Sequence, residues 1–152
     1  MSGAAAAIDL FTIGSGRSSA EHFFDRLVRA RARVVVDVRL RPWSRLSGFA
    51  RKPDLPFLLG RIAAIAYRHE PLLAPTAKLL DDVRAGRIDW AGYANDYLAL
   101  LSARAVEARF EPASFDRACL MCSEAEPAHC HRRLAAEYLR QAWPRPVAIN
   151  HL

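Results

Sequence analysis

The sequence predicts an α/β fold with an open, largely parallel sheet and helices on both faces. Short apolar, β-branched runs alternate with helical patterns along the chain, and this alternation is typical of parallel sheets. The chain has 152 residues and is 52% hydrophobic, which fits one domain with a compact core. We expect this domain to span residues 8–152, after a short flexible N-terminal segment at residues 1–7.

Two strands and a helix open the predicted domain. Residues 7–14 (AIDLFTIG) are apolar and β-branched and end in glycine, as expected of a buried strand. The helical pattern that follows begins at Ser18, which makes a capping box with Glu21. Residues 33–39 (RVVVDVR) predict the second buried strand. A strand, a helix and a strand within about 30 residues form a βαβ unit, so we expect the two strands to be parallel and adjacent.

The next stretch combines a long loop with a short helix and a third strand. The loop covers residues 40–53, and Asp54 can cap a helix that has Pro56 in its first turn. Residues 64–69 (AIAYRH) are the candidate third strand. We expect a further loop in the PLLAPTA segment that follows.

The remaining residues continue the alternation of helices and strands. Helical patterns cover about residues 78–84 and 90–108. Residues 117–122 (RACLMC) predict a fourth buried strand, and Pro127 starts the next helix, where its missing N–H is tolerated. The segment PVAINHL closes the chain as a short strand. This order of elements is typical of a Rossmann-like sheet.

The chain is strongly basic. The formal net charge is +6, the isoelectric point is about 9.8, and all but two of the 22 lysines and arginines are arginine. Such a balance suits a polyanionic partner such as nucleic acid. The arginines are scattered among the helices, however, and a GC-rich coding bias produces the same composition. Charge alone therefore leaves nucleic-acid binding as one of two open interpretations.

Three features of the sequence bear on location. A run of about 18 apolar residues is absent, so we expect no membrane span. The first residues lack the basic character of a signal peptide. The cysteines number three, and an odd count without an export signal favours a reducing compartment with free or metal-bound thiols. We therefore expect a cytoplasmic protein.

Polar residues gather where the predicted strands end. Ligands of an open parallel sheet bind at the carboxyl ends of its strands. The segment GSGR ends the first strand, DVRLRPWSR the second, Tyr67 and His69 the third, and CSE leads from the fourth to CHRR. If all strands are parallel, these four regions meet at one edge of the sheet and form a site.

Several side chains in these regions suit an anionic ligand. The segment GSGRSS places Ser15, Arg17 and Ser18 before a helix N-terminus, which favours an anion, although an ordinary strand-to-helix turn fits equally well. Asp37 lies inside a buried strand, so we expect it to form an internal brace with an arginine. The other predicted ligand contacts use forked or polar donors: Arg39, Ser44, Arg45, Tyr67, His69 and Arg132.

The segment CSEAEPAHCHRR first suggests zinc. A zinc site would draw on four ligands: Cys119, Cys122, Cys130 and His131. Two objections oppose it. Residues three apart in a strand point to opposite faces, which separates Cys119 from Cys122. The neighbours Cys130 and His131 are also poorly placed to bind one metal ion, so we predict no metal.

A reactive thiolate and a packed turn are the other interpretations of this segment. Cys130 falls in the first turn of a predicted helix, with Arg132 nearby, and both features lower a thiol pKa. In a packed turn, cysteine acts only as a small hydrophobic residue, and we assign Cys119 to that role. For the rest we favour a functional cluster of Cys122, Glu124, Cys130, His131 and Arg132.

Six stretches occur in an order that resembles a known family: TIGSGRSSAEHF, VVDVRLRPWSR, AYRHEPLL, YANDYL, LMCSEAEPAHCHRRLAAEYL and INHL. They are similar to a mainly bacterial family catalogued as domain of unknown function 488, and cover nearly the whole chain. The resemblance implies a cytosolic α/β protein and names no reaction. Its pattern carries over to Arg17, Ser18, Asp37, Arg39, Ser44, Arg45, Tyr67, His69, Cys122, Glu124, Cys130, His131, Arg132 and His151.

These observations support two hypotheses about function. The first is a cytoplasmic enzyme that acts on an anionic, phosphate-bearing ligand, either a nucleotide or a nucleic-acid end. Its chemistry would come from Cys122, Glu124, Cys130 and His131. The second is a non-catalytic nucleic-acid-binding or regulatory module, in which the cluster is a structural clasp or a zinc site. The sequence indicates neither a cofactor nor an oligomeric state.

Overall fold

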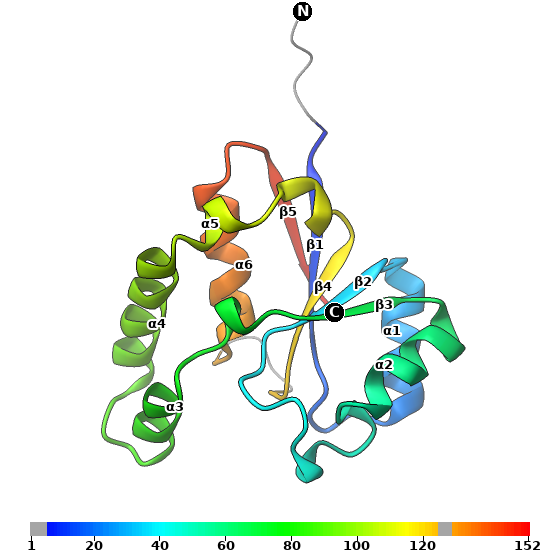
Figure 1. The fold of residues 1–152 in the computed structure, drawn as a ribbon, viewed down its shortest axis with the longest axis horizontal. Coiled ribbons are helices and arrows are strands. Elements are labelled where there is room, and N and C mark those ends of the chain that lie inside the picture. The colour runs from blue at the N-terminus through cyan, green and yellow to red at the C-terminus, as the bar shows by residue number, and fades with distance from the viewer. Residues whose placement is uncertain (1–5, 125–128) are drawn as a thin grey trace, which may run out of the picture.

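The computed structural model describes residues 6–124 and 129–152 (Figure 1). In that part of the chain, five parallel strands form one sheet in the order β3-β2-β4-β1-β5. The predicted α/β class with a parallel sheet is therefore confirmed. Each strand lies within the range predicted for it: β1 (Ile8–Gly14), β2 (Val34–Asp37), β3 (Ala66–His69), β4 (Ala118–Cys122) and β5 (Val147–His151).

The prediction that the first two strands are adjacent is wrong. β4 pairs with β1 on one side and with β2 on the other, so it separates them. The two strands are parallel, as expected, but the connection between them passes over the position that β4 fills. A local βαβ pattern gives the direction of both strands, and a later segment of the chain decides which strand lies between them.

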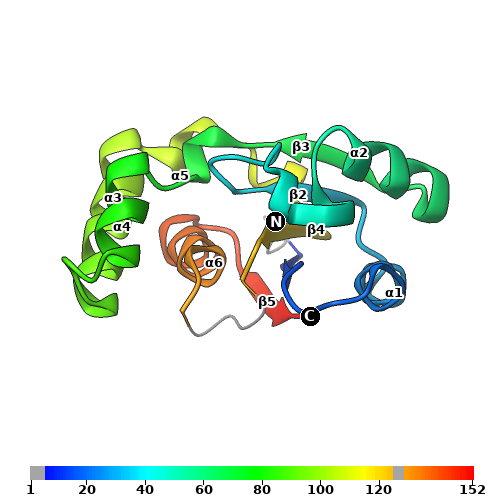
Figure 2. The same ribbon diagram turned by 90° about the horizontal axis from the view of Figure 1, so that it is seen from below.

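Helices cover both faces of the sheet, as the sequence predicts. Figure 2 shows α1 and α2 on one side and α3, α4 and α6 on the other. Short 3₁₀ turns interrupt the two predicted loops, at η1 (Arg45–Ala50) and η3 (Pro71–Leu73), and a single π turn follows α2. The α-helices are α1 (Ala20–Ala30), α2 (Asp54–Leu58), α3 (Ala77–Arg84), α4 (Trp90–Arg104), α5 (Val106–Arg109) and α6 (His131–Ala142).

Alternation along each strand divides the core into two clusters. In β4, Leu120 and Cys122 pack toward α4 and α6, whereas Cys119 and Met121 pack toward α1 and α2. Successive strand residues point to opposite faces, so each of the three central strands, β2, β4 and β1, contributes to both clusters. The centre of the sheet is therefore buried on both sides, which explains why β2 and β4 are so rich in apolar residues, whereas the edge strands β3 and β5 are more exposed and more polar.

Two predicted helix caps differ from those in the structure. Ser19, not Ser18, is the N-cap of α1, and its hydroxyl accepts a hydrogen bond from the backbone N–H of His22 at 3.1 Å. Two consecutive serines make either cap plausible from sequence alone. Asp54 is the first residue of α2 and does not cap it, because Pro53 occupies the cap position without a side-chain hydrogen bond.

Three other sequence-based expectations have limited or no structural counterpart. Pro127 and residues 1–5 of the predicted N-terminal segment lie outside the described residues. The helix expected to start at Pro127 begins at His131, because His129 is in a turn and Cys130 is the extended N-cap residue. Among the described residues, none of the helices has the length and apolar character needed to cross a membrane.

Candidate functional site

A cavity of about 640 Å³ lies at the carboxyl edge of the sheet, where β1 and β4 end. Its wall comes from the turn before α1, the loop after β2, the end of β4, part of α3 and the start of α6. Three of the four predicted polar regions therefore share one space. The predicted site residues that line it are Ser15, Arg17, Ser18, Arg39, Ser44, Cys122, Glu124 and His131.

The remaining predicted residues do not line this cavity. Tyr67 and His69 lie behind its wall and hold the loop that follows β2. Cys130 and Arg132 are buried at the start of α6, in contact with Cys122. The side chain of Arg45 lies outside the described part of the chain.

Sequence reasoning missed Arg84, which reaches the cavity from the last turn of α3. An exposed arginine at the end of a helix is common, because a positive charge there interacts favourably with the helix dipole. The local sequence around it contains no motif, so only the packing of α3 beside the cavity identifies it. Ser47 and Ser123 also line the cavity without having been predicted.

Asp37 and Arg39 form the internal brace that the sequence suggests. The Arg39 guanidinium donates two hydrogen bonds to the Asp37 carboxylate, from Nε at 2.8 Å and from Nη2 at 2.7 Å. The hydroxyl of Tyr67 donates a third at 2.6 Å. The pKa of Tyr67 is raised, mainly because the side chain is buried and to a smaller extent because its hydroxyl is hydrogen-bonded to Asp37. The carboxylate is fully buried, so these charge-assisted hydrogen bonds offset the cost of removing it from water.

Arg39 also anchors the loop that forms the cavity wall. Its Nη2 donates to the carbonyl of Ala50 at 2.7 Å, and its own carbonyl accepts from His69 Nε2 at 2.8 Å. The third nitrogen of the fork, Nη1, is buried and has no hydrogen-bond partner among the described residues. Because Arg39 lines the cavity and is held by Asp37, it gives this part of the wall a fixed positive charge.

Arg132 supports the opposite wall from inside the protein. It is 2% exposed, and its Nη1 donates to the sulfur of Cys122 at 3.0 Å and to the carbonyl of Glu124 at 2.6 Å. Gly14 lies against the same carbonyl, and a Cβ at this position would clash with it. The end of β1 and the loop after β4 can approach this closely only because residue 14 has no side chain.

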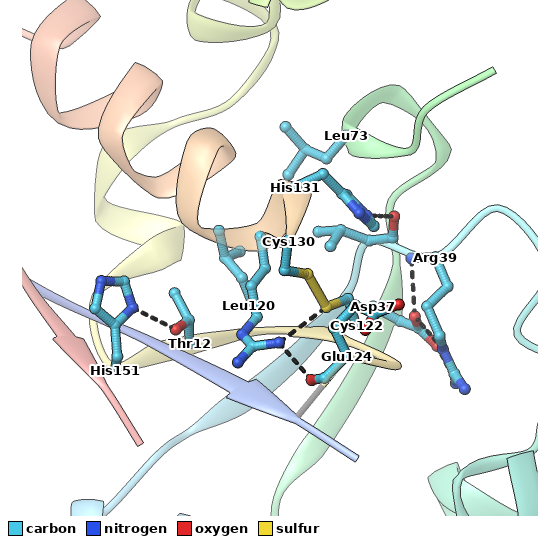
Figure 3. Close-up of a disulfide and its surroundings, with 12 residues drawn as sticks. Thr12, Asp37, Arg39, Leu73, Leu120, Cys122, Glu124, Cys130, His131 and His151 are labelled. Atoms are coloured by element: carbon cyan, nitrogen blue, oxygen red, sulfur yellow. Dashed lines mark hydrogen bonds and ion pairs between the residues drawn. A yellow bond between two sulfur atoms is a disulfide. The ribbon is translucent and has the colours of Figure 1, made fainter. Parts of the chain in front are cut away.

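Cys122 and Cys130 are joined by a disulfide (Figure 3). The expectation of free or metal-bound thiols is therefore wrong for these two residues in this structure and holds for Cys119. Cys119 is fully buried in the other core cluster, and burial raises the pKa of its thiol. Cys130 is the N-cap of α6 and does not lie in its first turn, which the expected start at Pro127 had implied.

His131 is held in a neutral form at the start of α6. Its Nε2 lies 2.8 Å from the carbonyl of Val38, which can only accept, so Nε2 carries the proton and Nδ1 keeps a lone pair. Burial lowers the pKa of His131 to about 4, although the hydrogen bond to Val38 opposes this effect. The ring also makes an edge contact with Tyr97, at 5.5 Å between centroids.

The charged residues that line the cavity are mostly cationic. Among the described residues, four arginines and one carboxylate, that of Glu124, line it. Arg17 has a positive φ of 54° in the turn before α1, a conformation that is uncommon outside glycine. The N-terminus of α1 follows this turn, and its dipole adds positive potential. The arginines are Arg17, Arg39, Arg41 and Arg84.

The fold and the site thus define an α/β protein with an arginine-lined cavity at the carboxyl edge of a parallel sheet. A family model, described as domain of unknown function DUF488, matches residues 19–139. Because the match covers more than half of the chain, this protein belongs to the DUF488 family, as the resemblance in its sequence predicted. No curated protein and no solved structure gives a significant match.

Proposed function

We propose that this protein is a cytoplasmic enzyme that binds a phosphate-bearing ligand, a nucleotide or a nucleic-acid end, in the cavity at the sheet edge. The observation that carries the proposal is the set of four arginines, against one carboxylate, among the described residues that line the cavity. Guanidinium groups recognise phosphate through paired N–H donors. A volume of about 640 Å³ is also within the range of small-molecule sites.

The arginines divide into a fixed and an adjustable group. Arg39 is 5% exposed and is held by Asp37, so its position is set before a ligand arrives. Arg17, Arg41 and Arg84 are exposed and can adjust to the ligand. A preorganised donor lowers the entropic cost of binding, whereas flexible donors add charge and screen the bound phosphate.

The chemical step is assigned to the cluster at the end of β4. Cys122 lines the cavity, and its sulfur receives a hydrogen bond from Arg132, which favours the thiolate once the disulfide is open. His131 is neutral and lines the same cavity, so it can accept a proton from a thiol or a water molecule. Glu124 lines the same cavity and supplies an acid or base, and Cys130 re-forms the disulfide by exchange with an external disulfide, which takes up the two electrons and two protons and becomes two thiols.

Calorimetric titration with inorganic phosphate and with a nucleoside monophosphate tests the binding step. We expect both to bind the wild-type chain, and the double variant R41A/R84A to bind at least about tenfold more weakly, since a hydrogen bond to a charged group contributes about 1.5–3 kcal/mol. The matched control is R29A, an exposed arginine of α1 outside the cavity. Equal loss of affinity in R29A would show that net charge, not the cavity, binds the anion.

Iodoacetamide labelling of the reduced protein tests the chemical assignment. We expect Cys122 to react faster near neutral pH than a free thiol, and R132K to slow it, because lysine lacks the forked donor that contacts sulfur and carbonyl together. Cys119 is the internal control: it lies in the other core cluster, on the opposite face of the sheet and outside the cavity, so it should stay unlabelled. If Cys122 reacts no faster than a free thiol, its role as a nucleophile is wrong.

A further inference from the structure

Three side chains that could bind a metal ion, two cysteines and one histidine, lie close together at the start of α6. A sulfur of Cys122, the sulfur of Cys130 and a ring nitrogen of His131 all lie within 4.8 Å of one another, and all three side chains are buried. Figure 3 shows Cys122 arriving from the end of β4, and Cys130 and His131 from the first residues of α6. The sequence-based objection that Cys130 and His131 are poorly placed to share one metal ion is therefore wrong, because the chain turns between them.

The other objection is confirmed. Cys119 packs in the core cluster on the opposite face of the sheet from Cys122, so it takes no part in the group. A four-ligand site with both cysteines of CLMC is excluded on this geometry. The group that remains has two sulfurs and one imidazole, and Cys122 and His131 also line the cavity.

We propose that Cys122, Cys130 and His131, once the disulfide is reduced, bind one zinc ion in the wall of the arginine-lined cavity. Two thiolates and one imidazole are ligands that zinc accepts, and three protein ligands leave a fourth position open toward the cavity. That an oxygen of the phosphate-bearing ligand takes this fourth position rests on the proposed function. Zinc binding holds both the Cys122 thiolate and the His131 imidazole, so these residues act as nucleophile and proton acceptor only in the reduced chain without metal.

The groups around these three residues fit a metal site better than a purely structural disulfide. His131 donates its Nε2 proton to the carbonyl of Val38, which orients the ring and leaves the other nitrogen free to bind, as is usual for a histidine ligand. The guanidinium of Arg132 donates to the Cys122 sulfur from inside the protein. A disulfide alone needs neither the neutral imidazole nor this donor.

The conversion between the two forms balances. A dithiol reductant gives two electrons and two protons to the Cys122–Cys130 bond, becomes a disulfide itself and leaves two thiols on the chain. Zinc then displaces both thiol protons into solvent. Two thiolates, one neutral imidazole and one Zn²⁺ carry no net charge together, whereas two adjacent buried thiolates without a metal would repel each other.

Zinc titration of the full chain, reduced with a trialkylphosphine, tests the inference. We expect one zinc ion per chain in competition with a chromophoric chelator. The variants C122A, C130A and H131Q should each bind at least about 100-fold more weakly, because losing a ligand costs no less than losing an outer-shell partner. The matched control is C119A, which removes a buried thiol from the same strand and should retain wild-type affinity.

Cobalt substitution of the wild-type chain gives a readout that does not depend on whether the variants fold. A tetrahedral site with two thiolates produces thiolate-to-cobalt charge-transfer absorption together with visible ligand-field bands. Absence of that absorption, less than a stoichiometric amount of bound zinc, or equal weakening by C119A would each overturn the inference.

Phosphate binding by the oxidised chain separates this inference from the proposed function. The bonded sulfurs cannot hold zinc, but the four arginines of the cavity are unchanged. If oxidised protein binds phosphate and reduced protein binds no zinc, only the metal site is wrong. If reduced protein binds zinc and neither form binds phosphate, the metal site stands and the proposed anionic ligand is wrong.

Discussion

At the scale of single residues, the geometry of the site depends on a few buried residues for which a substitution would disturb the surrounding contacts. Asp37 fixes Arg39, Arg132 fixes the loop after β4, and Gly14 allows that loop to approach β1. None of these three residues performs chemistry in the proposed function. They determine where the residues that contact the ligand are placed.

The variant G14A is expected to destabilise the protein by about 1–3 kcal/mol, the usual cost of forcing extra volume into a packed region. The added methyl group would meet the carbonyl of Glu124 and the Nη1 of Arg132. Chemical denaturation of both proteins measures the difference. The matched control is G60A, at a glycine with open space around it, which should not be destabilised. Equal stability of G14A and wild type would show that the loop moves aside.

Replacing Asp37 by alanine should cost about 3–5 kcal/mol of unfolding free energy, because it leaves the buried guanidinium of Arg39 without its partner. The comparison is D82A, which removes a carboxylate that pairs with Lys78 and Arg87 at the surface. Exposed ion pairs contribute little, so its melting temperature should barely change. If D82A lost much stability and D37A lost little, the expectation that the buried ion pair stabilises the fold more than the surface pair would be wrong.

At the scale of elements, the sequence predicts what depends on local pattern and misses what depends on distant packing. The central strands β1, β2 and β4 are short runs dominated by apolar residues, so their positions follow from the sequence pattern, and the shorter and more polar edge strands also lie within their expected ranges. The start of α6 does not follow from periodicity. Pro127 suggests a helix start in the sequence, whereas in the structure the cap is Cys130, three residues later, which is bonded to Cys122. Arg84 belongs to the site for a similar reason, since α3 packs beside a loop that precedes it by many residues.

The start of α6 should make stability depend on pH. His131 has a pKa of about 4 in the folded protein against a reference value of 6.5, so between these values the unfolded chain binds a proton that the folded chain does not. The contribution of His131 to the free energy of unfolding is therefore fully present above pH 6.5. It is lost as the pH decreases toward 4, and the loss for this group is about 3 kcal/mol.

Denaturation of the oxidised chain as a function of pH measures this loss. The bonded sulfurs exclude a metal under these conditions, so only protonation is measured. The variant H131Q should lose less stability between pH 6.5 and 4 than the wild type does. Parallel pH curves for the two proteins would contradict a depressed pKa at His131.

At the scale of the whole molecule, the basic charge could serve either a surface that binds nucleic acid along its length or a cavity that binds a phosphate-bearing end. The composition of the cavity favours the second role. A surface that binds nucleic acid along its length engages many phosphates, and its affinity then falls steeply with salt. In the part of the chain that the structure describes, four arginines line the cavity and three of them are exposed, so it can engage one or two phosphates of a chain end. The fold class and the edge where the site lies follow from sequence, but this distinction requires the packed structure.

A single-stranded oligonucleotide with a 5′-phosphate should bind more tightly than the same oligonucleotide without it. We expect a difference of about tenfold, and a slope of log affinity against log salt between about −0.7 and −1.4, since one or two phosphates are engaged and each contributes about 0.7. Fluorescence anisotropy over a range of salt concentrations measures both quantities. Equal affinity for the two oligonucleotides, with a much steeper slope, would favour the non-catalytic nucleic-acid-binding module.

The central position of β4 has a consequence for how the chain is made. β1 and β2 do not pair with each other, and both need the strand at Ala118–Cys122 as a neighbour, although β2 can pair earlier with β3 at Ala66–His69. The complete sheet cannot assemble before β4 has been made, and most of its pairings connect residues far apart in sequence. A nascent chain therefore exposes β1 and one edge of β2 until residues 118–122 have left the ribosome.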